Sequence, residues 1–323
     1  MAGLLSYLLR RILFAIPVFL TVSIITFLAT NASGNPVELV LIFVRNKTPE
    51  TIAALNAEFH MGEPIYTRYF LWLSDFLHGN LGVSLYSGSV ASKILPWTGT
   101  TLELQIPALL LSLVIGIPLG VFSAKHQYSK GDVAVTTTAI FGISMPTFWL
   151  GIMAIIIFSL DLHWLPSFGA VSAYPPYWWG SVTLDEVAHV ILPLGVLTLV
   201  SLASYVRLIR ANMLDALRQD FVLGARASGL SEFNVTYKHA LKNAVTPVVT
   251  FAGLTFGTLL AGAPALETTF SWPGLGYQFV VAATSLDLPV VQAITMIITI
   301  MVLVANVGLD LLYALLDPRV TIS

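Results

Sequence analysis

The residues that could carry out covalent chemistry are few, and their spacing matches no known catalytic arrangement. Histidines such as His78, His163, His189 and His239 are not accompanied by a His-Glu-x-x-His or Gly-x-Ser-x-Gly motif. No Gly-Lys dipeptide occurs, so the chain lacks the phosphate-binding loop of an ATPase. It also lacks cysteine, which excludes disulfides and thiolate metal sites. These patterns argue against an enzyme and predict no cofactor or metal bound by this chain.

Positive charge gathers in one segment, from Arg207 to Asn243, which holds six of the 15 Lys and Arg residues. A short helix is expected over Met213–Phe221, and Val222–Ser228 is expected to extend it or to begin another. The run Gly229-Leu230-Ser231-Glu232 is typical of a glycine helix stop followed by a serine cap. A further amphipathic helix is expected through Val235, His239 and Leu241. The segment is therefore predicted to be a folded helical hairpin, which suits docking better than a loop that only fixes topology.

The elements that must hold this hairpin are membrane spans. Hydrophobic residues make up 56% of the 323 residues and charged residues only 10%, and the mean hydropathy is +0.84, whereas about a quarter of the residues of a soluble domain are charged. A spanning helix needs roughly 20 apolar residues. Six such stretches are expected at Ile12–Thr30, Thr101–Ser123, Val133–Leu160, Ala188–Val206, Thr246–Leu266 and Pro289–Leu315. The sequence thus predicts an all-α membrane protein with about six transmembrane helices.

The Lys and Arg residues also predict the orientation, because positive residues near span ends stay in the cytoplasm. With the N-terminus inside, the cytoplasmic side holds Arg10, Arg11, Lys125, Lys130, Arg207, Arg210, Arg218, Arg226, Lys238, Lys242 and Arg319. The four outer residues are Arg45, Lys47, Arg68 and Lys93, all in a long first loop of the kind that is translocated regardless of charge. We therefore expect a multi-pass protein of the cell membrane with both termini in the cytoplasm.

These spans divide the chain into four parts: a cytoplasmic N-terminus and first transmembrane helix (1–30), an external loop with amphipathic helices (31–98), a five-helix transmembrane core that includes a cytoplasmic loop at 207–245 (99–316), and a cytoplasmic tail (317–323). In the external loop, Thr48-Pro49-Glu50 predicts a helix start. Gly62-Glu63-Pro64 predicts a break, and His78 to Gly82 a turn. A second apolar helix face is expected from Tyr66, Phe70, Leu73 and Leu77. Packing on the spans is favoured for this loop over direct substrate binding, and the Asn46-Lys47-Thr48 triplet could accept a glycan.

Inside the expected spans, the pattern indicates helix packing rather than ion coupling. Gly116 and Gly120 are four residues apart, as are Gly253 and Gly257, which lets another helix approach closely. Pro118 and Pro146 can bend their helices. Ionisable residues are scarce: Glu103 and Asp310 lie near span ends and His189 begins the fourth span. Because ion-coupled carriers keep charged groups at depth, this scarcity argues against a secondary carrier.

Several segments, in this order, resemble the B-type permeases of the dipeptide, oligopeptide and nickel group of binding-protein-dependent ABC importers. The strongest is Asp220 to Glu232 with His239 to Ala244 and Pro247, which resembles the ATPase-coupling loop. The others are Gly79-Asn80-Leu81-Gly82, Thr101 to Leu104, Ser144-Met145-Pro146 with Phe148-Trp149, Glu267 to Gly276, and Asp310 to Arg319. Two departures are Leu223-Gly224-Ala225, where the wider family has Glu-Ala-Ala, and Gly79-Asn80 in place of Gly-Asp. The first departure leaves no acidic residue to carry the role of that glutamate.

The resemblance implies the type I importer (MetI-like) permease fold, with a cytoplasmic coupling helix and a long external first loop. It implies that the chain forms half of the pathway for peptides and pairs with a second, homologous C-type permease. Two cytoplasmic ATPases would use ATP and Mg, an external binding protein would deliver the cargo, and no nucleic acid would be involved. Oligosaccharides or nickel are alternative cargoes within the same type of transporter, while an intramembrane enzyme and a secondary carrier are alternatives of other classes.

The resemblance also suggests individual site residues. Those expected on or beside the helix that docks with the ATPase are Ala225, Arg226, Gly229, Leu230, Ser231 and Glu232. Small residues let a helix seat deeply, and an arginine offers charge-assisted hydrogen bonds. A turn-rich segment with Phe270, Trp272, Pro273 and Gly274 is a candidate external gate, and aromatic anchoring at the membrane interface is the alternative role.

Overall fold

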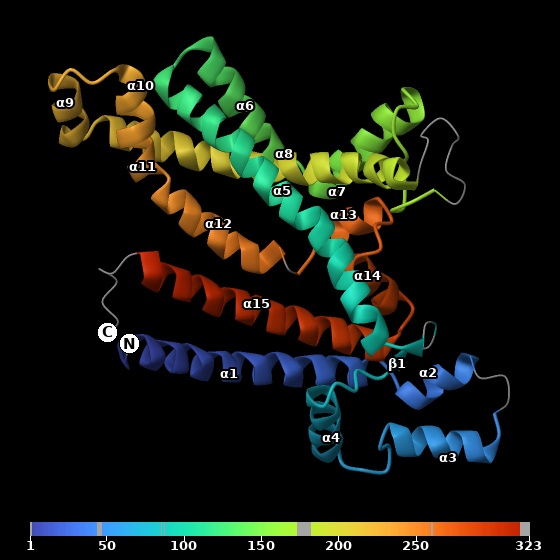
Figure 1. Cartoon of the computed structure of the whole chain (residues 1–323). Helices are drawn as coiled ribbons and strands as arrows, with labels where there is room; N and C mark the ends of the chain where they lie inside the picture. Colours follow the sequence, from blue (N-terminus) through green and yellow to red (C-terminus); the bar gives the residue numbers. More distant parts are fainter. Residues whose placement is uncertain are drawn as a thin grey trace. The chain divides into compact units, whose positions relative to one another are not determined.

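The computed structural model describes residues 2–43, 47–84, 86, 88–172, 182–259 and 261–316. The predictions for Arg45, Asn46 and the 317–323 tail lie outside these residues. The described chain is almost entirely helical (Figure 1). The long helices are α1 (Ala2–Ala32), α5 (Ala91–Lys125), α6 (Lys130–Ser144), α8 (Val182–Leu217) and α15 (Leu288–Leu316). The shorter helices are α2 (Pro36–Phe43), α3 (Pro49–Glu58), α4 (Ile65–Leu77), α7 (Thr147–Ala154), α9 (Asp220–Ala227), α10 (Glu232–Asn234), α11 (Leu241–Ala244), α12 (Thr246–Leu259), α13 (Pro264–Thr269) and α14 (Leu275–Thr284). Two π-helical segments, η1 (Ile155–Asp161) and η3 (Val235–Ala240), continue α7 and α10.

Four described helices are long and apolar enough to cross a membrane, within α1, α5, α8 and α15. The third predicted span is instead a helix pair, α6 followed by α7 and η1, bent by 106° at Met145 and Pro146. The bend expected at Pro146 is therefore confirmed, because a proline cannot continue the hydrogen-bond ladder, whereas Pro118 lies inside the continuous helix α5.

The fifth predicted span, Thr246–Leu266, is not one helix. The helix α12 ends at Leu259, and α13 begins only at Pro264. Fourteen residues rise only about 21 Å, less than the roughly 30 Å of a bilayer core. Hydropathy alone could not detect this break, because residues on both sides of Gly262, which has φ +78°, are apolar or small.

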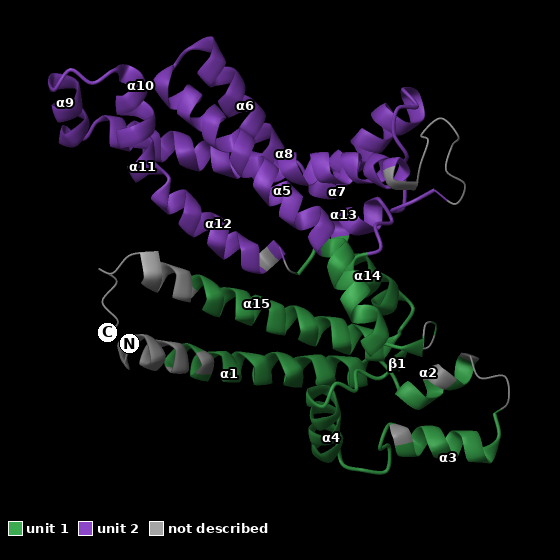
Figure 2. Cartoon of the chain, in the orientation of Figure 1, with its two compact units in different colours: residues 1–101, 260–264, 274–323 green, residues 102–259, 265–273 purple. Residues whose placement is uncertain are grey.

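The chain forms two compact units (Figure 2). Unit 1 comprises residues 1–101, 260–264 and 274–323, and unit 2 comprises residues 102–259 and 265–273. The boundary between the units therefore falls inside α5, after Thr101, and the chain crosses again on both sides of α13.

In unit 1, α1 and α15 lie side by side (Figure 1), and the Gln292 amide donates a hydrogen bond of 2.6 Å to Thr30 Oγ1. The helix α4 crosses α1 through an aromatic contact, since the Phe27 and Trp72 ring centroids are 5.5 Å apart. A two-stranded hairpin, β1 (Val83–Ser84) and β2 (Gly88–Ser89), pairs Val83 with Ser89 and Ser84 with Gly88. Ser84 Oγ donates a hydrogen bond of 2.5 Å to Asp287 Oδ2, which fixes the hairpin to the start of α15.

The helices of the segment predicted to be external form as expected in their main features. Thr48 caps α3, and its hydroxyl accepts from the Thr51 amide at 3.2 Å. The turn after α4 contains Gly79 and Gly82, both with positive φ. The predicted apolar face of α4 is only partly right: Leu73 is buried, whereas Tyr66, Phe70 and Leu77 are each about two-thirds exposed. The helix packs instead through Tyr69, Trp72, Leu73 and Phe76. The helix α2 and the β hairpin have no counterpart in the sequence prediction.

In unit 2, α8 is the element against which α5, α6 and α7 pack. A Cβ atom at Gly120 would lie 2.5 Å from Ile209 Cγ2 and 3.0 Å from the Val206 carbonyl oxygen, and one at Gly116 would lie 3.1 Å from Tyr205 Cβ. The predicted role of Gly116 and Gly120 in close helix packing is thus confirmed, because only glycine lets the α5 backbone approach α8 so closely.

Candidate functional site

The predicted docking segment is a folded helical hairpin of residues 218–244 at the end of α8. Its first half differs from the prediction, because α8 continues without a break to Leu217 and no separate helix covers Met213–Phe221. The predicted glycine stop and serine cap are confirmed. Gly229 follows α9 with φ +76°, and Ser231 Oγ accepts from the Asn234 amide at 3.4 Å to begin α10.

The turn at Gly229 closes α9 with two backbone hydrogen bonds. The Gly229 amide donates to the Arg226 carbonyl at 3.0 Å, and the Leu230 amide donates to the Ala225 carbonyl at 3.3 Å. This is the pattern of a Schellman motif, in which the residue after the helix cap adopts a left-handed conformation. Open space surrounds the position of an added Cβ at Gly229. The requirement for glycine therefore comes from the backbone angle and not from crowding.

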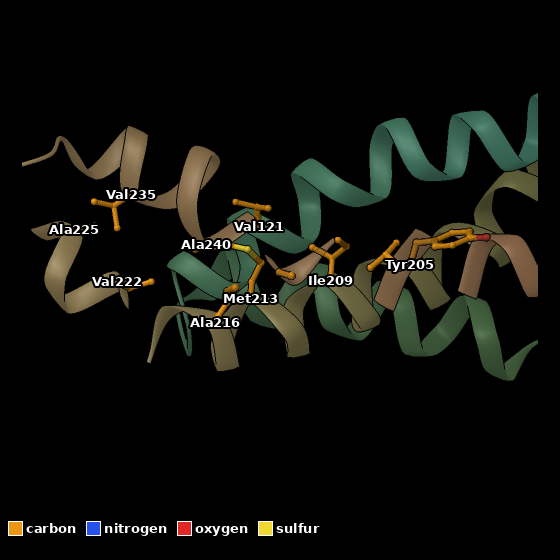
Figure 3. Close-up of a cluster of buried hydrophobic side chains, with 12 residues drawn as sticks. Val121, Tyr205, Ile209, Met213, Ala216, Val222, Ala225, Val235 and Ala240 are labelled. Carbon is orange, nitrogen blue, oxygen red and sulfur yellow. The ribbon is translucent and has the colours of Figure 1, made fainter. Parts of the chain in front are cut away.

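The inner face of the hairpin joins a core cluster that runs along α8 (Figure 3). Its labelled members are Tyr205, Ile209, Met213 and Ala216 of α8, Val121 of α5, Val222 and Ala225 of α9, and Val235 and Ala240 of η3. Val222 and Val235 are fully buried, and each stabilises the attachment by about 1.5 to 3 kcal/mol. The hairpin is therefore an extension of the helical core and not a separate lobe on a linker.

Several large apolar side chains of the hairpin stay exposed. They are Phe221, Leu223, Leu230, Phe233 and Tyr237, and Phe233 is 68% exposed. The Phe233 and Tyr237 rings are in contact, with centroids 4.7 Å apart and planes tilted by 36°. Such a group of apolar side chains, on a segment that also carries charges, is typical of a protein interaction surface.

Arg226 does not extend freely from the hairpin. Its Nε donates to Glu232 Oε1 at 2.8 Å and its Nη2 to Glu232 Oε2 at 3.3 Å, so this pair bridges the turn. The hydrogen bond from Arg226 lowers the pKa of the Glu232 carboxyl below its ordinary value. Ala225 lies on α9 as expected, but its side chain faces the core cluster. Of the six predicted site residues, Arg226, Gly229, Leu230, Ser231 and Glu232 are therefore exposed, while Ala225 supports them from inside.

A largely buried ion pair between α8 and α6 was missed from the sequence. Arg210 of α8 donates from Nε to Asp132 Oδ1 at 2.7 Å and from Nη2 to Asp132 Oδ2 at 2.8 Å. Asp132 also accepts hydrogen bonds from Ser123 Oγ, from Thr136 Oγ1 at 3.2 Å and from the Tyr128 amide at 2.8 Å. The Ser129-x-x-Asp132 spacing, with Ser129 as the N-cap of α6, is the signal that could have identified this helix start.

The candidate gate residues lie in two environments. Phe270 and Trp272 are each only 2% exposed, and the Gly169 amide donates to the Phe270 carbonyl at 2.8 Å. The Phe270 ring also limits Gly151, where an added Cβ would lie 3.0 Å from Phe270 Cε2. Such burial contradicts the alternative of aromatic anchoring at the lipid interface, since anchoring rings face the membrane. Pro273 ends unit 2, and Gly274 is the N-cap of α14 in unit 1.

The residues considered for other kinds of site stay dispersed. Within the described residues, no group of three or more histidine, cysteine, aspartate or glutamate side chains could hold a metal ion. His189 lies against its own helix, with Nδ1 2.8 Å from the Asp185 carbonyl oxygen. Asp185 in turn accepts from the Ser172 hydroxyl at 2.8 Å.

Comparison with known proteins matches the whole length of the chain. Residues 116–322 match the family described as binding-protein-dependent transport system inner membrane component, and residues 4–89 match the N-terminal family of the same membrane components. The chain is 36% identical to the oligopeptide transport system permease protein AppB of Bacillus subtilis, over 98% of this chain and 99% of that protein. It is 37% identical to the dipeptide transport system permease protein DppB of Escherichia coli K12, and 37% identical to the di/tripeptide transport system permease protein DppB of Pseudomonas aeruginosa, with the same coverage in each case. The chain therefore belongs to the inner membrane components of binding-protein-dependent transport systems, and it is an ABC importer permease of the B type.

Proposed function

We propose that this permease forms half of the translocation pathway of an ATP-driven peptide importer, in a heterodimer with a second, homologous permease. Two cytoplasmic ATPases hydrolyse ATP with Mg, and one of them docks on the 218–244 hairpin, while an external binding protein delivers the peptide. Both chain termini face the cytoplasm. The names of the relatives, which transport dipeptides, tripeptides and oligopeptides, support peptides as cargo.

The observation that carries this proposal is that the hairpin combines a buried attachment to the core with exposed apolar side chains. Its inner valines are locked into the α8 core, while its outer apolar side chains remain exposed. A segment whose only role is to fix topology needs no buried core and gains nothing from exposed Phe233. A surface that passes the movement of a partner protein to the rest of the chain needs a rigid attachment to the core. It also needs exposed apolar side chains that contact the partner.

The test is a reconstituted transporter with Phe233→Asp in this chain. Because Phe233 is 68% exposed, the variant is expected to insert and fold normally. It should lose the co-purifying ATPases, or hydrolyse ATP without peptide uptake. Tyr128→Asn is the matched control, since Tyr128 is 83% exposed but lies in the turn between α5 and α6. Normal ATPase binding and uptake in Phe233→Asp would overturn the docking assignment.

The cargo is tested separately, by measuring the affinity of the cognate external binding protein for peptides, oligosaccharides and nickel. We expect peptides to bind most tightly. Uptake that follows an ion gradient in the absence of ATP would instead support a secondary carrier.

A further inference from the structure

Unit 1 contains a cavity of about 140 Å³ that the transport function described above does not use. Its walls come from the end of α1, the turns before and after α4, α4 itself and the start of α15. The residues that matter for its chemistry are Asn31, Arg68, Trp72, Asp75, Asn80 and Gln292. Most of these lie in the 31–98 segment, for which packing was favoured over substrate binding.

Arg68 is the charged group at the inner part of this cavity. Its Nη2 donates to Asn31 Oδ1 at 2.7 Å, whereas its Nε is buried and has no hydrogen-bond partner among the described residues. No carboxylate of the described residues lies within ion-pair distance of the guanidinium. Burial lowers the pKa of Arg68. The Arg68 side chain is only partly buried, but its buried Nε lacks an acceptor, which a ligand in the cavity can supply.

Asp75 supplies the opposite charge at the rim. It lies seven residues after Arg68 on α4, so both residues are on the same face of the helix, with their Cα atoms about 10 Å apart along its axis. Asp75 is exposed, and its main-chain carbonyl accepts from the Asn80 amide at 2.9 Å. Trp72 lines the wall between them and packs on Phe27, which gives the middle of the cavity an apolar surface.

The walls are held in place without a ligand. Gln292 of α15 is hydrogen-bonded to Thr30 of α1 at 2.6 Å. The backbone at Gly82 lies against α15 so closely that an added Cβ would be 3.1 Å from Pro289 Cβ. A site whose polar groups are already positioned loses little entropy when a ligand enters.

We propose that this cavity binds a short peptide by its two ends. The carboxylate accepts hydrogen bonds from Arg68, the ammonium group lies at Asp75, and the apolar surface of Trp72 faces the backbone between them. A chain of three residues spans roughly 10 Å when extended, which is comparable to the axial spacing of the Arg68 and Asp75 Cα atoms, whereas the phosphate and ammonium of an ethanolamine headgroup are separated by only a few bonds. Because a tripeptide is larger than the cavity of about 140 Å³, its carboxylate end enters the cavity and its ammonium end lies at the opening, beside the exposed Asp75. The choice of a peptide rests on the proposed function and adds to it a site on the permease itself, apart from the external binding protein.

The test is direct binding of radiolabelled trialanine to the complete transporter in nanodiscs, without the external binding protein. We expect Arg68→Gln to weaken binding roughly 10- to 100-fold, the loss expected for a charge-assisted hydrogen bond. Asp75→Asn should weaken it less, because Asp75 is exposed. C-terminal amidation of the peptide should weaken binding to the native protein, but it should add little to the defect of Arg68→Gln. N-terminal acetylation of the peptide should likewise weaken binding to the native protein, but it should add little to the defect of Asp75→Asn.

Lys93→Gln is the matched control, since Lys93 is another positive residue of the 31–98 segment but does not line this cavity. Arg68→Lys keeps the charge and should retain part of the affinity, and it guards against a loss caused by misfolding. Equal binding by the native protein and Arg68→Gln would overturn the proposal, as would a cavity filled by phosphatidylethanolamine that trialanine cannot displace. If trialanine binding fails while ATP-driven peptide uptake persists, only this site is wrong. If ATP-driven peptide uptake is absent, the proposed function is wrong.

Discussion

The ion pair of Asp132 and Arg210 allows the sharpest stability prediction. The Asp132 side chain is 4% exposed and the Arg210 side chain 23%, and the carboxylate accepts hydrogen bonds from five donors. In Asp132→Asn one oxygen becomes an NH₂ group that faces other donors, and the guanidinium loses its counter-charge. Removing one partner of a fully buried pair costs about 3 to 5 kcal/mol. Because Arg210 is partly exposed, we expect about 3 kcal/mol here.

This loss should lower the midpoint of thermal unfolding of the detergent-solubilised transporter by roughly 5 to 10 °C. Intrinsic fluorescence during heating, with size-exclusion chromatography of heated samples, measures it. Glu232→Gln is the control, because it removes a salt bridge whose side chains are 42% and 61% exposed. Exposed pairs contribute little to global stability, so the control midpoint should equal that of the native protein.

A double-mutant cycle separates the ion pair from general damage to the site. Combining Asp132→Asn with Arg210→Met removes the charge that the single variant leaves unpaired. The double variant should therefore be more stable than the sum of the two single effects predicts, by about 1 to 3 kcal/mol. Additive losses, or an Asp132→Asn midpoint within 1 °C or so of the native value, would refute the claim that the pair stabilises unit 2.

Three further predictions concern single positions. Gly229→Ala should destabilise the hairpin by about 1 kcal/mol, because alanine is strained at φ +76°. Gly224→Ala in α9, where the added Cβ also meets open space, should stabilise the hairpin by roughly 0.5 to 1 kcal/mol. Chemical denaturation measures both changes. Gly120→Ala should destabilise the protein by about 1 to 3 kcal/mol through its clash with α8. Gly195→Ala within α8, with nothing within 4 Å of its added Cβ, should instead stabilise it by roughly 0.5 to 1 kcal/mol in the same measurement. Since the folded-state pKa of Glu232 is lowered, its contribution is complete above the unfolded pKa of about 4.3 and is lost as pH falls through the folded value. Hydrogen exchange of the turn amides should show this loss in the native protein but not in Glu232→Gln.

The long helices and the hairpin of residues 218–244 could be predicted because their signals are local. Apolar runs of about 20 residues, a glycine stop at Gly229 and a serine cap at Ser231 each depend only on neighbouring residues. The same holds for Thr48 and for the bend at Pro146. The continuation of α8 to Leu217 could not be predicted in this way, since the apolar run ends near Val206 while the helix is sustained by packing of Ile209 and Met213 against other elements.

The environment of individual site residues depends on contacts distant in sequence. Arg210 was counted among the positive residues of the cytoplasmic side, but its ion-pair partner Asp132 lies 78 residues earlier in the chain. Arg68 was counted as an outer charge, and the cavity that it lines includes Gln292 at the other end of the chain. The residue types alone did not indicate what Arg210 or Arg68 contacts, because an ion pair or a pocket formed by different helices can be seen only in the packed structure.

The attachment of the hairpin determines how movement can pass through the permease. The helix α8 is 36 residues long without a break, which corresponds to about 54 Å, and the hairpin is fixed to its end by buried Val222 and Val235. The bond from Arg210 to Asp132 then ties the same part of α8 to the start of α6. A displacement of α9 must therefore move α8 and α6 together, because packed helices shift as rigid bodies more easily than they deform. We expect bending to occur instead where helices already end, at Pro146 and around Gly262. A disulfide engineered between α9 and η3 should consequently leave transport intact, whereas loss of the Arg210 pair should reduce uptake more than it reduces ATP hydrolysis.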